Sequence, residues 1–136
     1  MENEWKLIAE APGHAWEFNA PFQLGRTLDI GDGPEVALVS EIGVEDGDII
    51  LVASDGVFDN LYQETILDII NKTTKKGVLD RPEKTAELIA EASFRMGPDI
   101  FFFSPFSYNA FHAGLAYYGG KVDDITIIVA QVHLKS

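Results

Sequence analysis

The sequence predicts an α+β fold, with antiparallel β-sheet layers and helices on their outer face. Two short apolar segments, residues 49–54 and 125–134, predict strands, and two amphipathic segments between them predict helices. Because strands and helices occur in separate runs and do not alternate, we expect the helices to lie together on one side of the sheet.

The N-terminal part contributes less regular strands. Residues 6–11 and 15–18 predict two short strands around a turn at Pro12-Gly13-His14. Residues 35–42 alternate loosely between apolar and polar side chains, which predicts a further strand. An acidic turn at residues 45–48 joins it to the next strand, so we expect these two strands to form a hairpin.

The two apolar strands are predicted to be central. Ile49 to Ser54 contains only apolar and small residues, and both faces of Ile125 to Leu134 are mostly apolar. Such composition is typical of strands that are buried on both sides of a sheet.

Two helices are expected between these strands. The first is expected at about residues 63–73, where apolar side chains recur at helical spacing. Lys75-Lys76-Gly77 ends it with the basic residues and the glycine that a helix C-terminus favours. The second begins near Pro82, because proline suits the first turn of a helix, and ends before Gly97-Pro98.

The composition excludes several classes of function. The chain has 136 residues, of which 46% are hydrophobic, so residues 1–136 can form one domain with its own core. A net charge of −12 disfavours nucleic acid and anionic lipid as partners. The lack of cysteine excludes disulfides, thiolate catalysis and zinc–thiolate sites. No apolar run is long enough to span a membrane, and the polar N-terminus shows no secretory signal.

Two acidic turns carry the candidate chemistry. Asp55-Gly56 follows directly on the strand at residues 49–54, so a rigid sheet would present the Asp55 carboxylate at an open loop. Asp123-Asp124 immediately precedes the last strand. If the two strands are antiparallel neighbours, only one of the later acids can join Asp55, since successive strand side chains point to opposite faces.

Such a pair of carboxylates needs a compensating charge. Two carboxylates about 4 Å apart repel by about 4 kcal/mol at an effective dielectric constant near 20. Either one of them is protonated or a cation lies between them, and oxygen ligands alone favour Mg²⁺ or Mn²⁺. Asp59 follows in the same loop. It either joins this site or serves the nearby helix through capping, favourable charge or a local hydrogen bond.

Residues 100–111 are unusually aromatic and include three consecutive phenylalanines, Phe101 to Phe103. One interpretation is a plug that packs a loop and a short helix onto the sheet. The other is an exposed patch that grips a partner or a substrate peptide. His112 follows this segment and is a candidate proton donor, although no companion residue accompanies it in the sequence.

The two acidic turns together resemble the motifs of a known family. Residues 53–60, ASDGVFDN, and residues 119–130, GGKVDDITIIVA, are the segments concerned. They are similar to the last two metal-site motifs of the metal-dependent protein phosphatases of type 2C, the PPM family. Either motif alone is a weak signal, whereas the two together are fairly specific.

The resemblance implies roles for individual residues. Asp55 and Asp123 fall on metal ligands of the family, and Asp59 falls on an acid associated with a weaker, additional metal. Residues 18–24 and 104–106 further resemble the branch that includes mitochondrial and plastid matrix phosphatases. The expected compartment is therefore intracellular, such as a mitochondrial or plastid matrix.

The resemblance also implies a fold and a reaction. The fold is an α/β/β/α sandwich, of which residues 1–136 resemble the C-terminal half, a single partial domain. The reaction is hydrolysis of phosphoserine or phosphothreonine in a phosphoprotein substrate by water that two Mg²⁺ or Mn²⁺ ions activate. The family's phosphate-binding arginine and upstream Asp-Gly metal motif have no match before residue 20, so we expect the chain alone to be weakly active or inactive.

Other interpretations stay open. Half a sandwich exposes sheet edges and an apolar face, so we expect self-association or pairing with a complementary half. A second function class is a non-catalytic regulatory or binding module derived from the same fold. A third is an unrelated metal-dependent hydrolase that uses Asp55 and Asp123.

Overall fold

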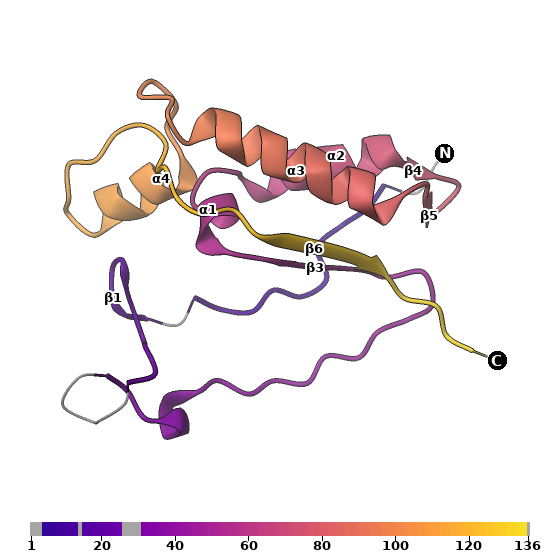
Figure 1. Ribbon diagram of the computed structural model, residues 1–136, viewed down its shortest axis with the longest axis horizontal. Helices are drawn as coiled ribbons and strands as arrows, with labels where there is room; N and C mark the ends of the chain where they lie inside the picture. Colours follow the sequence, from indigo (N-terminus) through magenta and orange to yellow (C-terminus); the bar gives the residue numbers. More distant parts are fainter. Residues whose placement is uncertain (1–3, 14, 26–30, 136) are drawn as a thin grey trace. The chain divides into compact units, whose positions relative to one another are not determined.

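The computed structural model describes residues 4–13, 15–25 and 31–135 (Figure 1). The chain divides into two compact units. The larger unit combines Met1–Leu7 with Val44–Ser136, and the smaller is Ile8–Gly43. The elements of the smaller unit are β1 (Ala15–Glu17), β2 (Ala20–Pro21) and the 3₁₀ helix η1 (Pro34–Val36). Those of the larger unit are β3 (Ile49–Ala53), α1 (Asp55–Phe58), α2 (Gln63–Thr73), β4 (Thr74–Lys75), β5 (Val78–Leu79), α3 (Pro82–Met96), α4 (Pro105–His112) and β6 (Ile127–Gln131).

In the smaller unit, β1 pairs with β2 in an antiparallel arrangement. Asn19 lies in the turn between them with φ 55°, a left-handed conformation that asparagine tolerates better than most residues. The predicted hairpin around residues 12–14 is therefore wrong. Residues 6–11 form no strand in the part of the chain that the structure describes, and His14 lies outside the described residues.

The strand predicted at residues 35–42 is also wrong. Pro34 opens η1, because the fixed φ of proline suits the first turn of a helix. After η1, residues 37–42 are described and belong to no strand, and Val39 is 94% exposed. An alternating pattern makes a strand only where another strand pairs with it, and none of the described strands does so here.

β3 and β6 form a two-stranded antiparallel sheet, in register from Ile49 opposite Gln131 to Ala53 opposite Ile127. Both predicted apolar strands are confirmed, although β6 is shorter than the predicted 125–134. Their antiparallel pairing meets the condition under which the two acidic turns can come together. This register places the end of β3 beside the start of β6, which is where the two acidic turns lie.

The two faces of this sheet differ. Helices α2 and α3 lie on the same side of β3 and β6 (Figure 1), and the side chains on that face pack on a core that includes Val57 and Ile89. On the other face, Ile50, Val52 and Ile128 are 43%, 58% and 62% exposed. The prediction that both strands are buried on both sides is wrong for the described chain, because the helices cover one face only.

Helices α2 and α3 confirm the two predicted helices, and Pro82 lies in the first turn of α3 as expected. The Thr85 hydroxyl of α3 donates a hydrogen bond to Thr73 Oγ1 of α2 at 2.8 Å. Trp5 fastens the N-terminal segment to the end of α2, because its indole N–H donates to Thr74 Oγ1 at 2.9 Å. None of the helices that the structure describes has the length and apolar character needed to cross a membrane.

Candidate metal centre

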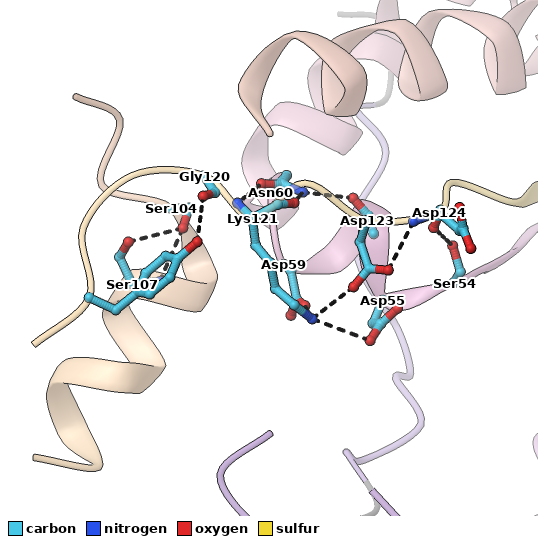
Figure 2. A network of polar contacts seen from close by, with 12 residues as sticks. Ser54, Asp55, Asp59, Asn60, Ser104, Ser107, Gly120, Lys121, Asp123 and Asp124 are labelled. Atoms are coloured by element: carbon cyan, nitrogen blue, oxygen red, sulfur yellow. Dashed lines mark hydrogen bonds and ion pairs between the residues drawn. The ribbon is translucent and has the colours of Figure 1, made fainter. Parts of the chain in front are cut away.

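Three acidic side chains meet where β3 ends and β6 begins. One carboxylate oxygen from each of Asp55, Asp59 and Asp123 lies within 4.8 Å of the others. Figure 2 shows these carboxylates turned toward one another from two segments that are far apart in the sequence. The structure therefore brings together all three residues that the sequence predicts as metal ligands, and their binding of metal stays a prediction.

The two acidic turns are held together by the Ser54 side chain and by close backbone packing at Gly56. The Ser54 hydroxyl donates to the Asp124 carbonyl at 2.8 Å and accepts the Thr126 N–H at 2.9 Å. A Cβ on Gly56 would collide with the same Asp124 carbonyl oxygen, so glycine is needed at this position. The second acidic turn therefore packs directly against Gly56.

Asp123 and Asp124 have different roles in this arrangement. Asp123 directs its carboxylate into the cluster, whereas Asp124 contributes its backbone carbonyl to Ser54 (Figure 2). This confirms that only one of the two adjacent acids joins Asp55. The Asp124 N–H donates to Asp123 Oδ1 at 2.9 Å, which orients the Asp123 carboxylate.

Asp59 belongs to the cluster and not to the following helix. Helix α2 begins after Tyr62 without a side-chain cap, so Asp59 does not cap it. The Asp59 carboxylate instead accepts a hydrogen bond from the Lys121 ammonium at 2.8 Å. Its backbone carbonyl accepts the Phe106 N–H at 3.1 Å, which connects the cluster to the start of α4.

The sequence prediction missed Lys121, whose ammonium lies among the three carboxylates. Its Nζ is 2.8 Å from Asp59 Oδ2, 2.9 Å from Asp123 Oδ2 and 3.7 Å from Asp55 Oδ2. Carboxylate repulsion is thus relieved by a lysine, an alternative to the proton or metal ion that the sequence suggested. The only signal in the sequence was one basic residue inside the second acidic motif, GGKVDD.

The lysine changes the acid–base balance of the cluster. Burial raises the pKa of Asp59, and the hydrogen bond from Lys121 offsets this only in part. The pKa of Asp123 is lowered, mainly by its hydrogen bond from Lys121 and then by the Asp124 N–H. Burial alone would lower the pKa of Lys121, but hydrogen bonds to Asp123 and Asp59 outweigh burial and raise it. Lys121 is therefore a charged ammonium at neutral pH.

The backbone of Lys121 is fixed by the buried side chain of Asn60. The Asn60 amide donates to the Lys121 carbonyl at 2.7 Å and to the Gly56 carbonyl at 3.0 Å, and its oxygen accepts the Lys121 N–H at 2.8 Å. Gly120 lets the chain pass the end of α3, because a Cβ there would collide with the Met96 carbonyl. One buried amide thus connects both acidic turns.

The aromatic segment is partly packed and partly exposed. Phe106 in α4 is buried, and its ring meets the Tyr117 ring edge-on with centroids 4.8 Å apart. Phe101, in contrast, is 92% exposed. Phe106 is therefore packed, as the plug interpretation expects, whereas Phe101 is exposed, as the patch interpretation expects. His112 lies outside the acidic cluster, with its Nδ1 2.9 Å from the Tyr108 carbonyl.

The chain is similar over most of its length to known protein phosphatases. It is 39% identical over 131 residues to the probable protein phosphatase 2C 80 of Arabidopsis thaliana, covering 95% of this chain and 30% of that protein. It is 37% identical over 121 residues to the protein phosphatase PTC7 homolog of Homo sapiens, covering 85% of this chain and 40% of that protein. No family model matches the chain.

A solved structure is similar in both fold and sequence. The X-ray structure of the photosystem II phosphatase PBCP has a TM-score of 0.79 and 30% sequence identity, covering 92% of this chain and 51% of that chain. The likeness confirms the predicted α+β class. The chain spans 30% and 40% of the length of the two relatives above and about half of the solved chain.

Proposed function

We propose, from the premise that this chain is a homologue of the type-2C protein phosphatases, that it takes part in metal-dependent hydrolysis of phosphoserine or phosphothreonine in proteins. The observation that carries the proposal is the convergence of Asp55, Asp59 and Asp123 within 4.8 Å. Because the chain spans less than half of these two curated relatives, their activity is carried over to it as a proposal.

The three carboxylates fit a hard divalent cation. All donor atoms of the cluster are oxygens, which suits Mg²⁺ or Mn²⁺ and not metals that prefer thiolate or imidazole. Opposite ligands of one Mg²⁺ lie about 4.2 Å apart, since each Mg–O distance is about 2.1 Å. The 4.8 Å limit of the cluster is therefore close to the span of a single ion. We assign Asp55, Asp59 and Asp123 as the residues that hold it.

The chain's own residues would orient the site. Ser54 and Gly56 lock the first acidic turn against the second, and Asn60 fixes the path of residues 120–121. Metal bound at this site would lower the pKa of a water molecule and polarise the phosphoryl group. Because both turns begin or end on paired strands, the carboxylates are positioned before any metal or substrate arrives.

One observation favours a second candidate, the non-catalytic binding module. A lysine ammonium already neutralises part of the carboxylate charge, so the cluster is stable as an ion-pair network without metal. In that case the acidic turns would serve only to hold the fold together. Metal binding and hydrolysis, measured on the same variants, separate the two candidates.

The test uses calorimetry with Mn²⁺ and an assay of phosphopeptide hydrolysis. The variants are Asp55→Ala and Asp123→Ala, with Asp68→Ala as a matched control, because Asp68 is an exposed acid on α2 away from the cluster. We expect the wild-type chain and the control to bind Mn²⁺, and both cluster variants to lose that binding. Hydrolysis should depend on Mn²⁺ and fall in the same two variants. Failure of the wild-type chain to bind Mn²⁺, together with equal background rates in all four proteins, would favour the binding module.

We further propose a phosphoprotein substrate and an intracellular compartment such as a mitochondrial or plastid matrix. The support is the resemblance of residues 18–24 and 104–106 to the matrix branch of the family, and the similarity to a structure named as a photosystem II phosphatase. Imaging of the fluorescently tagged full-length gene product in its native cells tests the compartment. A uniformly cytosolic signal would contradict a location in a mitochondrial or plastid matrix.

A further inference from the structure

We propose that Lys121 is a built-in counter-cation of the acidic cluster: its ammonium holds Asp55, Asp59 and Asp123 together without metal and must leave when a divalent ion binds. The inference rests on the proposed function, because it assumes that these carboxylates are the metal ligands. It adds a residue that controls how tightly the site holds metal.

The position of Lys121 is fixed at both ends. Its backbone is clamped on either side by the Asn60 amide, which is 1% exposed. Its ammonium lies 4.9 Å from the centre of the buried Phe106 ring, a distance at which a cation is attracted to the ring face. Figure 2 shows the side chain extending from the Asn60 clamp to the three carboxylates. The clamped backbone therefore keeps Lys121 beside the cluster, and only its side chain is free to change position.

The ammonium and a metal ion need the same oxygen atoms. Nζ contacts Oδ2 of Asp59 at 2.8 Å and Oδ2 of Asp123 at 2.9 Å, and those oxygens face the centre of the cluster. A Mg²⁺ ion bound by them would lie about 2.1 Å from each, which leaves no room for the ammonium at its present place. Two cations this close also repel each other. Metal binding therefore requires the Lys121 side chain to move.

Lys121 differs from the ordinary surface ion pairs of this chain. Lys84 contacts Glu87 at 2.8 Å, but the Lys84 side chain is 43% exposed against 19% for Lys121. Exposed pairs of this kind contribute little, because water and salt screen them. Lys121 contacts three acids at once in a partly buried place, so its removal leaves carboxylates that lack a compensating charge.

The first experiment measures Mn²⁺ affinity by calorimetry for the wild-type chain, Lys121→Met, Lys121→Arg and Lys84→Met. We expect Lys121→Met to bind Mn²⁺ about tenfold more tightly, because the metal then no longer has to displace an ammonium from the same carboxylates. Lys121→Arg keeps a positive charge and should bind Mn²⁺ no more tightly than the wild type. Lys84→Met should match the wild type, since that lysine lies outside the cluster.

The second experiment measures thermal unfolding in EDTA and in Mn²⁺. We expect Lys121→Met to unfold about 3 °C or more below the wild type in EDTA, because the carboxylates then repel without a counter-ion. Mn²⁺ should raise the unfolding temperature of Lys121→Met by more than it raises that of the wild type. This readout requires no enzymatic activity and also reveals whether the variant folds.

The outcomes separate the two proposals. Equal or weaker Mn²⁺ binding by a folded Lys121→Met, with binding by the wild type, would overturn the role of Lys121 and leave the metal site intact. Failure of both the wild type and Lys121→Met to bind Mn²⁺ would overturn the metal site, and the displacement of Lys121 with it. Tighter Mn²⁺ binding by Lys121→Met than by the wild type, with Lys121→Arg no tighter than the wild type, would support both.

Discussion

The two faces of the β3–β6 sheet are made of similar apolar residues but have different surroundings. On one face, Val57, Ile89 and their neighbours form a core with α2 and α3. On the other, Val52 and Ile128 are more than half exposed. A strand that is apolar on both sides therefore has two faces on which other elements can pack. Its composition does not tell whether the described chain itself provides both of those covering layers.

The sharpest way to test this contrast is to truncate one residue on each face. Ile89→Ala removes a side chain that is fully buried between α3 and the sheet, so we expect a loss of about 2–5 kcal/mol in the free energy of unfolding. Val52→Ala, on the open face, should cost much less, about 0.5 kcal/mol. Urea unfolding followed by circular dichroism measures both. Equal losses would mean that the open face is packed in solution.

Asn60→Ala tests whether the buried interior on the helix-covered side of the sheet also supports the acidic cluster. The substitution leaves the Gly56 carbonyl and both backbone groups of Lys121 without their buried partner, so we expect a loss of about 1–3 kcal/mol. It should also weaken the clamp on Lys121. The same unfolding assay measures the loss, and a value within experimental error of the wild type would show that water replaces the amide.

Ser54→Ala tests the connection between the ends of β3 and β6. The substitution removes one hydrogen bond to the Asp124 carbonyl and one from the Thr126 N–H. Because Ser54 lies at an open end of the sheet, water can substitute in part, so we expect a smaller loss of about 1 kcal/mol. Unfolding measurements on Ser54→Ala and Ser54→Thr decide the point, since threonine keeps the hydroxyl and should retain most of the stability.

The smallest effect on monomer stability is expected on the open face, where Ile128→Lys should change the free energy of unfolding by about 0.5 kcal/mol or less. Its effect on association should be larger. If the wild-type chain self-associates through this face, the charge should shift it toward the monomer. Size-exclusion chromatography with light scattering measures this. A stable monomer of the wild-type chain at high concentration would contradict the expected self-association.

The elements that the sequence predicted correctly are those determined by neighbouring residues or by a strong periodic pattern of apolar side chains. The apolar spacing in residues 63–73 and the proline at the start of α3 are sufficient to define two helices. The acidic turns were predictable because each directly adjoins an apolar strand, and antiparallel pairing then leaves room for only one of Asp123 and Asp124.

The elements that the sequence did not predict depend on partners far away in the chain. Residues 35–42 alternate like a strand but have no pairing strand among the described residues. Asn60 and Lys121 looked like ordinary polar residues, because the contact between them joins segments whose approach is set by the β3–β6 register. Nothing in a lone lysine reveals that folding will place three carboxylates around it.

The positions of the acidic side chains depend on the register in which Ala53 pairs with Ile127. A slip of one residue would shift β6 by about 3.3 Å and turn its side chains to the opposite face, which would carry Asp123 away from Asp55. Asp55 and Asp59 are synthesised long before Asp123, so under the proposed metal role a divalent ion could bind all three only after this strand pair has formed. The proposed cation would then bind late in folding and would stabilise only those molecules in which β6 has paired with β3 in the correct register.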